Sequence, residues 1–190
     1  MTAPARPPRR WPPDRRFVPA PLRTAAPSAI SRPSMPLSLD PDALTANSRL
    51  TAIRLALLTS RAMENWRRDV GDNGSAMILL AVVAICGERL TRTELPAPLR
   101  SVATPLPPGI AAGCNVASIA AATGLNRETT RRKVAALVEA GYLARSADGE
   151  LTYPTGRQQD PATLDFVRRQ LEAVVRFANE ALRDGVLTAV

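Results

Sequence analysis

The chain of 190 residues contains no histidine and only two cysteines, Cys86 and Cys114. Histidine is the commonest metal ligand in proteins and the usual general base of hydrolytic enzymes, so its absence argues against both roles. Neither cysteine has a second one at the spacing of a zinc site, and we expect both thiols to be reduced in a cytoplasmic protein. The chain also lacks a Gly-rich phosphate loop and a defined pair of carboxylates. We therefore expect no enzymatic activity, no metal and no cofactor.

Long hydrophobic runs are missing as well. The apolar segment from Ala76 to Cys86 has eleven residues, whereas a membrane-spanning helix needs about 20. The N-terminus lacks the long apolar core of a secretory signal. We expect no membrane association. A segment that is apolar on all sides is typical of a helix in the middle of a bundle, and we expect Ser75 to cap this helix and the helix to end between Arg89 and Arg92.

Acidic residues are scarce near the N-terminus. The net charge of +8 comes from 25 basic and 17 acidic residues, and residues 1–36 hold seven Arg, one Asp and 10 of the 18 Pro. Proline at this density disfavours helix and leaves a chain without a core, which predicts a disordered Pro/Arg-rich tail over 1–36. The tail is either an arm that attracts phosphates without sequence preference or a leader without that function. Because this tail carries +6 of the +8, the total charge is poor evidence that the folded part binds nucleic acid.

Two long helices are predicted outside the middle of the chain. Residues 37–72 contain one, from Ser38 or Asp40 to about Asp69, and residues 158–190 contain the other, from Asp160 or Thr163 to about Asp184. The second helix has a wider apolar stripe than one contact within the chain requires. That stripe contains Leu164, Val167, Leu171, Val174, Val175 and Phe177. We expect this helix to form a homodimer, and the alternative is that it packs on the first helix within a monomer.

The segment from Val116 to Tyr153 contains a predicted helix-turn-helix. An Ala-rich helix over 117–123 is followed by Gly124, which suits the positive φ of a helix C-cap. Asn126 is placed to cap a second helix, from Arg127 to about Ala140. The inward positions of this second helix recur at helical spacing: Thr130, Val134, Leu137 and Val138. Two helices joined by so tight a turn form a helix-turn-helix.

The outward face of the second helix is rich in basic residues near its N-terminus, where major-groove readers place their base contacts. This face carries Arg127, Glu128, Thr129, Arg131, Arg132 and Lys133. An Arg side chain can donate to O6 and N7 of guanine, and Glu128 can accept from N4 of cytosine. The Thr129 hydroxyl suits a phosphate oxygen at the helix N-terminus. The alternative is an ordinary solvated face.

A hairpin is predicted directly after the second helix. Gly141 ends that helix, and two short strands flank Asp148-Gly149, a pair that favours a type I′ turn. This order resembles that of bacterial winged helix-turn-helix transcription regulators. The GntR type has the most similar turn, which reads Ser/Asn-Arg-x-Thr, then an apolar residue and two Arg. Matching positions here are Asn126, Arg127, Thr129, Arg131 and Arg132, whereas Thr130 departs at the apolar position.

The resemblance implies that Arg127 and Arg131 read bases and that Thr129 holds phosphate. It also implies that Arg145, in the wing, contacts the minor groove or the DNA backbone. Helices from both ends of the chain around a winged domain are similar in layout to multiple-antibiotic-resistance (MarR-type) regulators, although that family usually has two C-terminal helices.

The sequence therefore predicts a mainly α protein with long N- and C-terminal helices and a winged helix-turn-helix domain at 73–157. A Pro-rich loop of unknown role, 93–113, interrupts the domain, and its apolar residues are expected to pack on the surface. The predicted DNA contacts are Asn126, Arg127, Glu128, Thr129, Arg131, Arg132, Lys133 and Arg145. The expected function is sequence-specific binding of double-stranded DNA by a cytoplasmic, dimeric, bacterial-type transcription regulator, with no effector identified. The alternatives are an initiator of replication or plasmid partition and a winged helix that binds protein.

Overall fold

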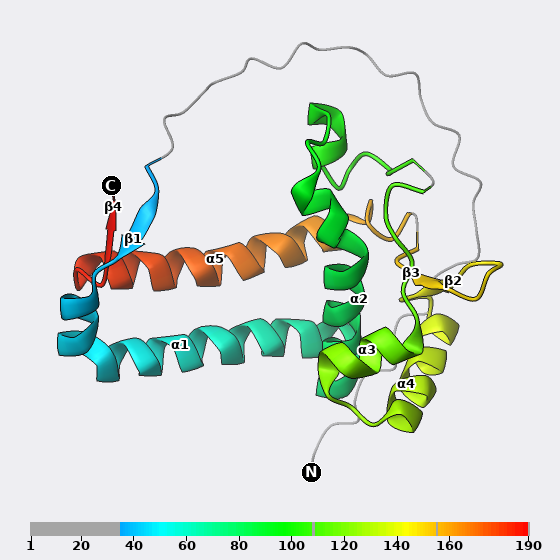
Figure 1. Ribbon diagram of the computed structural model, residues 1–190, viewed down its shortest axis with the longest axis horizontal. Helices are drawn as coiled ribbons and strands as arrows, with labels where there is room; N and C mark the ends of the chain where they lie inside the picture. The colour runs from blue at the N-terminus through cyan, green and yellow to red at the C-terminus, as the bar shows by residue number, and fades with distance from the viewer. Residues whose placement is uncertain (1–34, 108, 155, 190) are drawn as a thin grey trace. The chain divides into compact units, whose positions relative to one another are not determined.

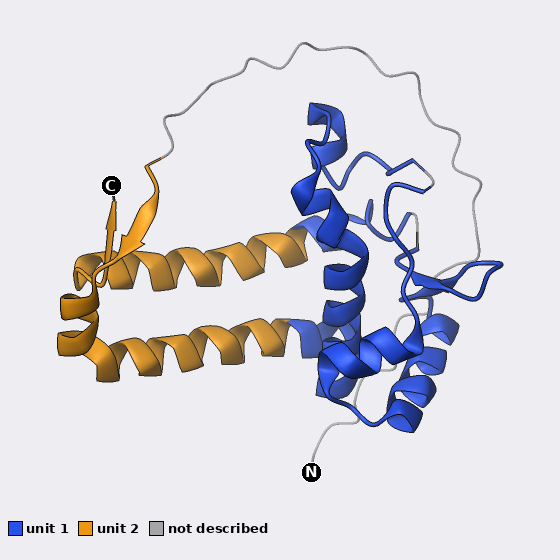
Figure 2. Cartoon of the chain, in the orientation of Figure 1, with its two compact units in different colours: residues 1–22, 66–164 blue, residues 23–65, 165–190 orange. Residues whose placement is uncertain are grey.

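The computed structural model describes residues 35–107, 109–154 and 156–189. The chain divides into two compact units (Figure 2): unit 1 comprises residues 1–22 and 66–164, and unit 2 comprises residues 23–65 and 165–190. The predicted tail, 1–36, lies outside the described residues except for its last two. Between them the two units contain a mainly helical fold, as the sequence predicts for the fold class, and two short strand pairs, of which only the hairpin around Asp148-Gly149 was predicted (Figure 1).

Unit 2 is built from both ends of the described chain. Helix α1 (Pro41–Val70) and helix α5 (Pro161–Arg183) supply most of it, and both continue into unit 1. Their limits agree with the predicted ones, and Asp40 starts α1 by accepting a hydrogen bond from the backbone N–H of Ala43 at 2.9 Å. Within unit 2 the two helices run antiparallel and side by side, with Thr51 and Ala181 buried. The packing of α5 on α1, weighed above as the alternative to a dimer, is therefore present in the chain.

A pair of strands that the sequence did not predict joins the ends of unit 2. Strand β1 (Leu37–Leu39) pairs antiparallel with β4 (Leu187–Ala189), and Ser38 lies opposite Thr188 with their hydroxyl oxygens 2.8 Å apart. From the sequence, the first helix is expected to start at Ser38 or Asp40 and the last one to end near Asp184, and no strand is assigned to 37–39 or 187–189. Each strand has only three residues, too few for a period-two pattern to show, and the partner lies at the other end of the chain.

Unit 1 has its core around helix α2 (Asn73–Arg92), which packs against α3 (Val116–Thr123) and α4 (Arg127–Glu139). The fully buried side chains of this core come from all three helices and from the hairpin, and include Ile78, Leu79, Val82, Ile119, Val134, Leu143 and Leu151. The prediction that α2 is the central helix of this domain is confirmed. The expectation that it is buried on all sides is wrong, because Leu80 and Val83 are 43% and 42% exposed.

Two further details of α2 differ from the prediction. Its N-cap is Asp72, whose side chain accepts from the backbone N–H of Ser75 at 3.1 Å, whereas Ser75 itself is buried within the first turn. The whole helix has 20 residues, and by length and composition alone it could cross a membrane. The core helix of a folded unit passes the same test, and the burial of Ile78, Leu79 and Val82 in unit 1 gives α2 that role.

The Pro-rich loop over 93–113 packs on unit 1 as predicted. It contains a short 3-10 helix, η1 (Ala97–Arg100), and its larger apolar side chains are all half-buried: Leu95, Leu99, Val102, Leu106 and Ile110. The side-chain amide of Gln159 donates to the backbone oxygen of Val102 at 2.9 Å. The loop is therefore held against the segment between the hairpin and α5.

Candidate nucleic-acid interface

The turn between α3 and α4 has the geometry that its sequence predicts. Helix α3 ends at Gly124, which has φ of 69° and donates from its backbone N–H to Ala120. Asn126 then caps α4 through its side-chain oxygen, which accepts from the backbone N–H of Glu128 at 2.8 Å. Leu125, between the two caps, is half-buried against the core. The caps fix the direction in which α4 leaves the turn.

One face of α4 is anchored in the core of unit 1. Thr130 and Val134 are fully buried and Leu137 nearly so, as predicted. Thr130 stands where the similar motif has an apolar residue, and its hydroxyl donates to the backbone oxygen of Asn126 at 3.0 Å. Because that bond satisfies the hydroxyl inside the helix, threonine is compatible with a buried position.

The opposite face of α4 presents its predicted basic residues to solvent. Arg127 and Arg132 are exposed, and neither side chain forms a hydrogen bond or ion pair with another described residue. Both guanidinium groups are therefore available to a ligand. Thr129, two positions after Arg127, is half-buried.

Arg131 is exposed but already has a partner on its own helix. Its Nε and one terminal nitrogen donate to the two carboxylate oxygens of Glu128, at 2.9 and 2.6 Å. These hydrogen bonds lower the pKa of Glu128 and raise the pKa of Arg131. Exposed ion pairs of this kind contribute little to stability. The same fork of donors that holds the carboxylate can therefore turn to a phosphate or a guanine edge at small cost.

Lys133 has a structural partner that the sequence did not reveal. Its ammonium group lies 2.6 Å from Oδ1 of Asp72, the N-cap residue of α2, and only 26% of its side chain is exposed. A Cβ on Gly74 would lie 2.8 Å from Cε of Lys133, so glycine leaves room for this link. Partial burial alone would raise the pKa of Asp72, but the hydrogen bonds from Lys133 and Ser75 outweigh it and lower the pKa from 3.8 to about 2. Lys133 therefore ties α4 to α2.

The hairpin after α4 is present, but its turn differs from the predicted type I′. Strand β2 (Ala144–Arg145) pairs with β3 (Leu151–Thr152), and Gly149 alone in the turn has positive φ, at 81°. Gly149 donates to the backbone oxygen of Ser146 at 3.0 Å, and Ser146 donates to Glu150 at 2.8 Å. This is a type I turn followed by a left-handed glycine, the usual three-residue hairpin loop. Asp148 keeps negative φ, so a type I′ turn is ruled out.

The base of the hairpin is held by a third backbone segment. Cys114, just before α3, exchanges two backbone hydrogen bonds with Leu151, of 2.9 and 2.7 Å. Leu151 therefore bonds to Cys114 on one side and pairs with Arg145 on the other. The Cys86 thiol, also buried, lies 3.7 Å from the backbone oxygen of Leu151. Both cysteines are free of disulfides in the structure, and they belong to this joint between α2, α3 and the hairpin.

Arg145 is exposed on the hairpin, and one of its guanidinium nitrogens donates to the backbone oxygen of Gly149 at 2.7 Å. The eight predicted contact residues thus all lie in unit 1, seven of them at the cap and in the first two turns of α4. No group of three or more potential metal ligands occurs in the described ranges. The chain matches no protein-family model, no curated protein and no solved structure.

Proposed function

We propose that the protein binds double-stranded DNA in a sequence-specific manner through a winged helix-turn-helix formed by α2, α3, α4 and the β2–β3 hairpin. The observation that carries this proposal is the two-sided character of α4. Its buried face fixes the helix by Thr130, Val134 and Leu137, while Arg127, Arg131 and Arg132 are exposed on the face away from the core. A helix held rigidly from behind, with mobile guanidinium groups in front, is what major-groove recognition requires.

The dimensions of α4 are compatible with this role. Its 13 residues extend over ~20 Å, and a helix with its side chains fits the ~12 Å width of the major groove. Arg127 and Arg131 are four positions apart and so lie on one side of the helix, one turn from each other. In this proposal both donate to guanine edges, Arg132 and the Thr129 hydroxyl contact phosphates, and Asn126 and Glu128 line the helix N-terminus. Lys133 remains paired with Asp72 and contributes mainly through the electrostatic attraction of its positive charge for the DNA.

The hairpin supplies the wing. Its position is fixed by Cys114 on one side, and its exposed Arg145 lies at the tip end, next to the turn. In this proposal Arg145 releases the oxygen of Gly149 and contacts the minor groove or a phosphate beside the major-groove site. A regulator of transcription in the cytoplasm is the function that best fits such a domain on a chain whose sequence has no histidine and no Gly-rich phosphate loop.

The experiment that tests the proposal is selection of bound duplexes from a random pool, followed by titration of Arg127→Ala and Arg131→Ala. Each lost Arg–guanine pair should reduce the preference for the selected site over a mismatched site by roughly 5- to 150-fold, the equivalent of ~1–3 kcal/mol. Arg92→Ala is the matched control, because Arg92 is also exposed and also paired with a glutamate of its own helix, Glu88, at 2.6 Å. It should change neither affinity nor preference.

The outcomes separate the alternatives. Equal losses on matched and mismatched duplexes would show that the two arginines contact only phosphate. Selection of directly repeated sites would favour a replication or partition initiator over a regulator that reads an inverted repeat. Failure to enrich any sequence, with no binding to random duplex at low salt, would refute DNA binding and leave a winged helix that binds protein.

A further inference from the structure

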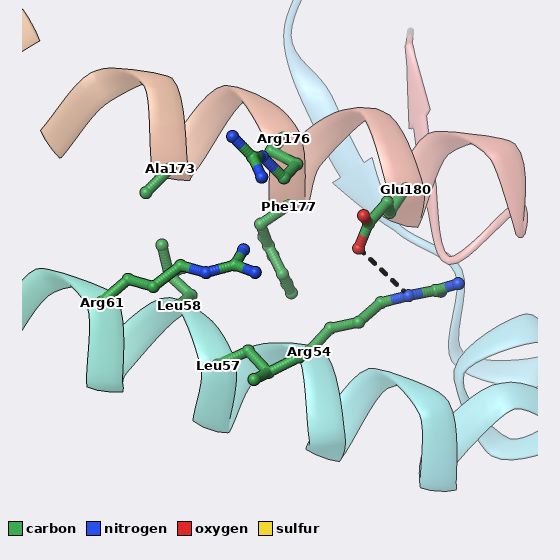
Figure 3. Close-up of a pocket in the computed structure, with 8 residues that line it drawn as sticks. All are labelled: Arg54, Leu57, Leu58, Arg61, Ala173, Arg176, Phe177 and Glu180. Carbon is green, nitrogen blue, oxygen red and sulfur yellow. Dashed lines mark ion pairs between the residues drawn. The ribbon is translucent and has the colours of Figure 1, made fainter. Parts of the chain in front are cut away.

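Helices α1 and α5 leave a hollow of about 150 Å³ between them within unit 2 (Figure 3). Both helices line it with the same spacing, which is 54, 57, 58 and 61 on α1 and 173, 176, 177 and 180 on α5. Positions i, i+3, i+4 and i+7 lie on one side of a helix, so each helix turns one continuous strip of side chains towards the hollow.

The floor of the hollow is apolar. Leu58 follows the buried Thr51 by seven positions, and Phe177 precedes the buried Ala181 by four. Both side chains therefore lie close to the line along which the helices pack, and both are half-buried. Ala173 lies across the hollow from Leu58 (Figure 3), and its side chain ends at Cβ. The small size of this alanine leaves the space that a larger side chain would fill.

The rim of the hollow carries two arginines without partners, one from each helix. Arg61 and Arg176 are exposed, and neither forms a hydrogen bond or ion pair with another described residue. Figure 3 shows both guanidinium groups beside Phe177. Two positive charges therefore stand over an apolar floor without a counter-ion from the part of the chain that the structure describes.

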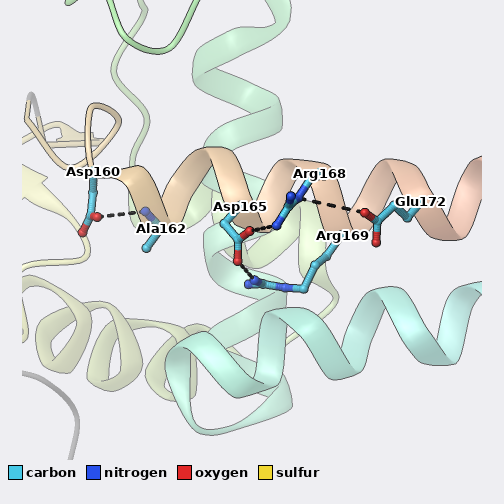
Figure 4. Close-up of polar contacts among 6 residues, drawn as sticks. All are labelled: Asp160, Ala162, Asp165, Arg168, Arg169 and Glu172. Carbon is cyan, nitrogen blue, oxygen red and sulfur yellow. Dashed lines mark hydrogen bonds and ion pairs between the residues drawn. The ribbon is translucent and has the colours of Figure 1, made fainter.

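The arginine two turns earlier on each helix is already neutralised. On α1 it is Arg54, which pairs with Glu180 at 3.2 Å and also with Asp184. On α5 it is Arg169, which pairs with Asp165 (Figure 4). The carboxylate that lines the hollow, that of Glu180, is thus held by Arg54 further along the helices, and the two unpaired arginines remain for a ligand.

We propose that the hollow binds a small phosphate monoester, with its phosphate between Arg61 and Arg176 and its apolar body on Leu58 and Phe177. The planar fork of an arginine fits phosphate oxygens, and one phosphate has enough oxygens for two such forks. The charge of a phosphate monoester at neutral pH, about −2, matches the two unpaired guanidinium groups. A single carboxylate would neutralise only one of them.

The volume limits the size of the ligand. Drug-sized ligands occupy pockets of ~300 Å³ or more, whereas an apolar cavity of ~150 Å³ holds about one benzene ring. The hollow, at about 150 Å³, therefore takes the body of an ester of about ten non-hydrogen atoms. Because the rim arginines are exposed, the phosphate can keep part of its hydration while the body is covered.

This inference concerns unit 2 alone, and it depends neither on DNA binding nor on the number of chains in the assembly. A ligand held by one arginine of α1 and one of α5 stabilises the pairing of these helices, because it binds only where both are in place. If the proposed function also holds, the hollow is the site of a small-molecule effector.

The test is titration of the full-length chain at low salt with phenyl phosphate, inorganic phosphate and benzoate, followed by ligand-observed NMR. We expect phenyl phosphate to bind with a Kd of ~1 mM or below, which a ligand of this size can reach. Inorganic phosphate lacks the ring and benzoate lacks the second charge, so each should bind at least ~5-fold more weakly.

Five variants locate the site. Arg61→Gln and Arg176→Gln should each weaken the binding of phenyl phosphate and of inorganic phosphate by ~5-fold or more. Ala173→Leu fills the hollow and should abolish the preference for the phenyl ester, and Leu57→Ser should reduce that preference by removing part of an apolar wall. The matched control is Arg183→Gln, because Arg183 is exposed and likewise unpaired among the described residues but does not line the hollow. It should change no affinity.

Four results would overturn the proposal. Absence of phenyl phosphate binding up to ~10 mM would remove the site. Benzoate that binds as tightly as phenyl phosphate would make the ligand a carboxylate. An equal loss in Arg183→Gln would show general attraction of anions to a basic chain. An unchanged preference for the phenyl ester in both Ala173→Leu and Leu57→Ser would exclude the apolar floor. Circular dichroism establishes that each variant is folded, and Leu57→Ser keeps the test valid should Ala173→Leu unfold.

Discussion

The link between Asp72 and Lys133 should be the main electrostatic contact that holds α4 on α2. Asp72 accepts from the backbone N–H of Ser75 at 3.1 Å, from the Ser75 hydroxyl at 2.6 Å and from Lys133 at 2.6 Å. Asp72→Ala removes all three and leaves the hydroxyl of the buried Ser75 without this acceptor. Asp72→Asn keeps an oxygen that can cap the helix but removes the charge.

The magnitude follows from the cap and from the pKa. Loss of an N-cap costs ~1 kcal/mol. Lowering the pKa of Asp72 from 3.8 to about 2 corresponds at most to ~2.5 kcal/mol, but half of the Asp72 side chain is exposed and solvent screening reduces this to ~1 kcal/mol. We expect Asp72→Ala to lower the free energy of unfolding by ~2–3 kcal/mol, counting the unpaired Ser75 hydroxyl. Asp72→Asn and Lys133→Met should each cost ~1 kcal/mol.

The pH dependence has a definite sign. The folded state holds the pKa of Asp72 below its ordinary value of 3.8, so the ion pair contributes its full stability above about pH 4. That contribution is lost as the pH falls towards about 2, where the carboxylate becomes protonated in the folded state as well. The contribution of this group should therefore be flat near neutral pH, and it should be absent at every pH in Asp72→Asn.

Urea denaturation followed by circular dichroism measures these quantities for the three single variants and for the double variant Asp72→Asn/Lys133→Met. The double-mutant cycle should give a coupling of ~0.5–1 kcal/mol at pH 7 that disappears near pH 2. A coupling of zero at pH 7 would show that the contact contributes nothing. An Asp72→Ala variant as stable as the wild type would refute the capping role too.

Two other predictions test the core of the motif and the charge of the tail. Thr130→Val should change the free energy of unfolding by less than ~1 kcal/mol, because the backbone oxygen of Asn126 keeps its bond from the backbone N–H of Thr130 at 2.9 Å. A loss above ~2 kcal/mol in thermal or urea denaturation would show that the hydroxyl is required. If the proposed DNA binding holds and 1–36 acts as an arm, deleting these residues should weaken binding to all duplexes alike and flatten its salt dependence. An unchanged salt slope in titrations at several salt concentrations would leave the tail without that role.

The parts of the fold that could be predicted are those whose information is local. The turn between α3 and α4 is specified by Gly124 and Asn126, two residues that act on the backbone beside them. The limits of α1 and α5 follow from long periodic segments. The presence of the hairpin follows from Asp148-Gly149, but its turn type does not, because one positive φ at Gly149 is enough when the loop has three residues.

The parts that could not be predicted depend on residues far apart in the chain. From the sequence the cap of α2 is expected at Ser75, whereas the structure has Asp72 there, and Asp72 is also held by Lys133, 61 positions away. The backbone pairing of Cys114 with Leu151 is a single bridge. It is too short to produce an alternating pattern of apolar and polar residues in the sequence. The exposure of Leu80 and Val83 depends on how many other elements pack around α2. The spacing of apolar residues along the helix does not give that number. The sequence likewise named the basic residues of α4 but could not show which of them are already paired.

The β1–β4 pair has a consequence for the order in which the chain folds. Unit 1 contains the continuous stretch 66–164, whereas unit 2 needs α1 from one end and α5 from the other, closed by strands whose paired residues Ser38 and Thr188 are 150 positions apart. On the ribosome, α4 and the core of unit 1 can form while α1 still lacks its partner. Closing so long a loop is slow compared with forming local helix contacts. Newly made chains should therefore acquire a folded unit 1 first, and the pairing of α1 with α5 only after the final strand has been released.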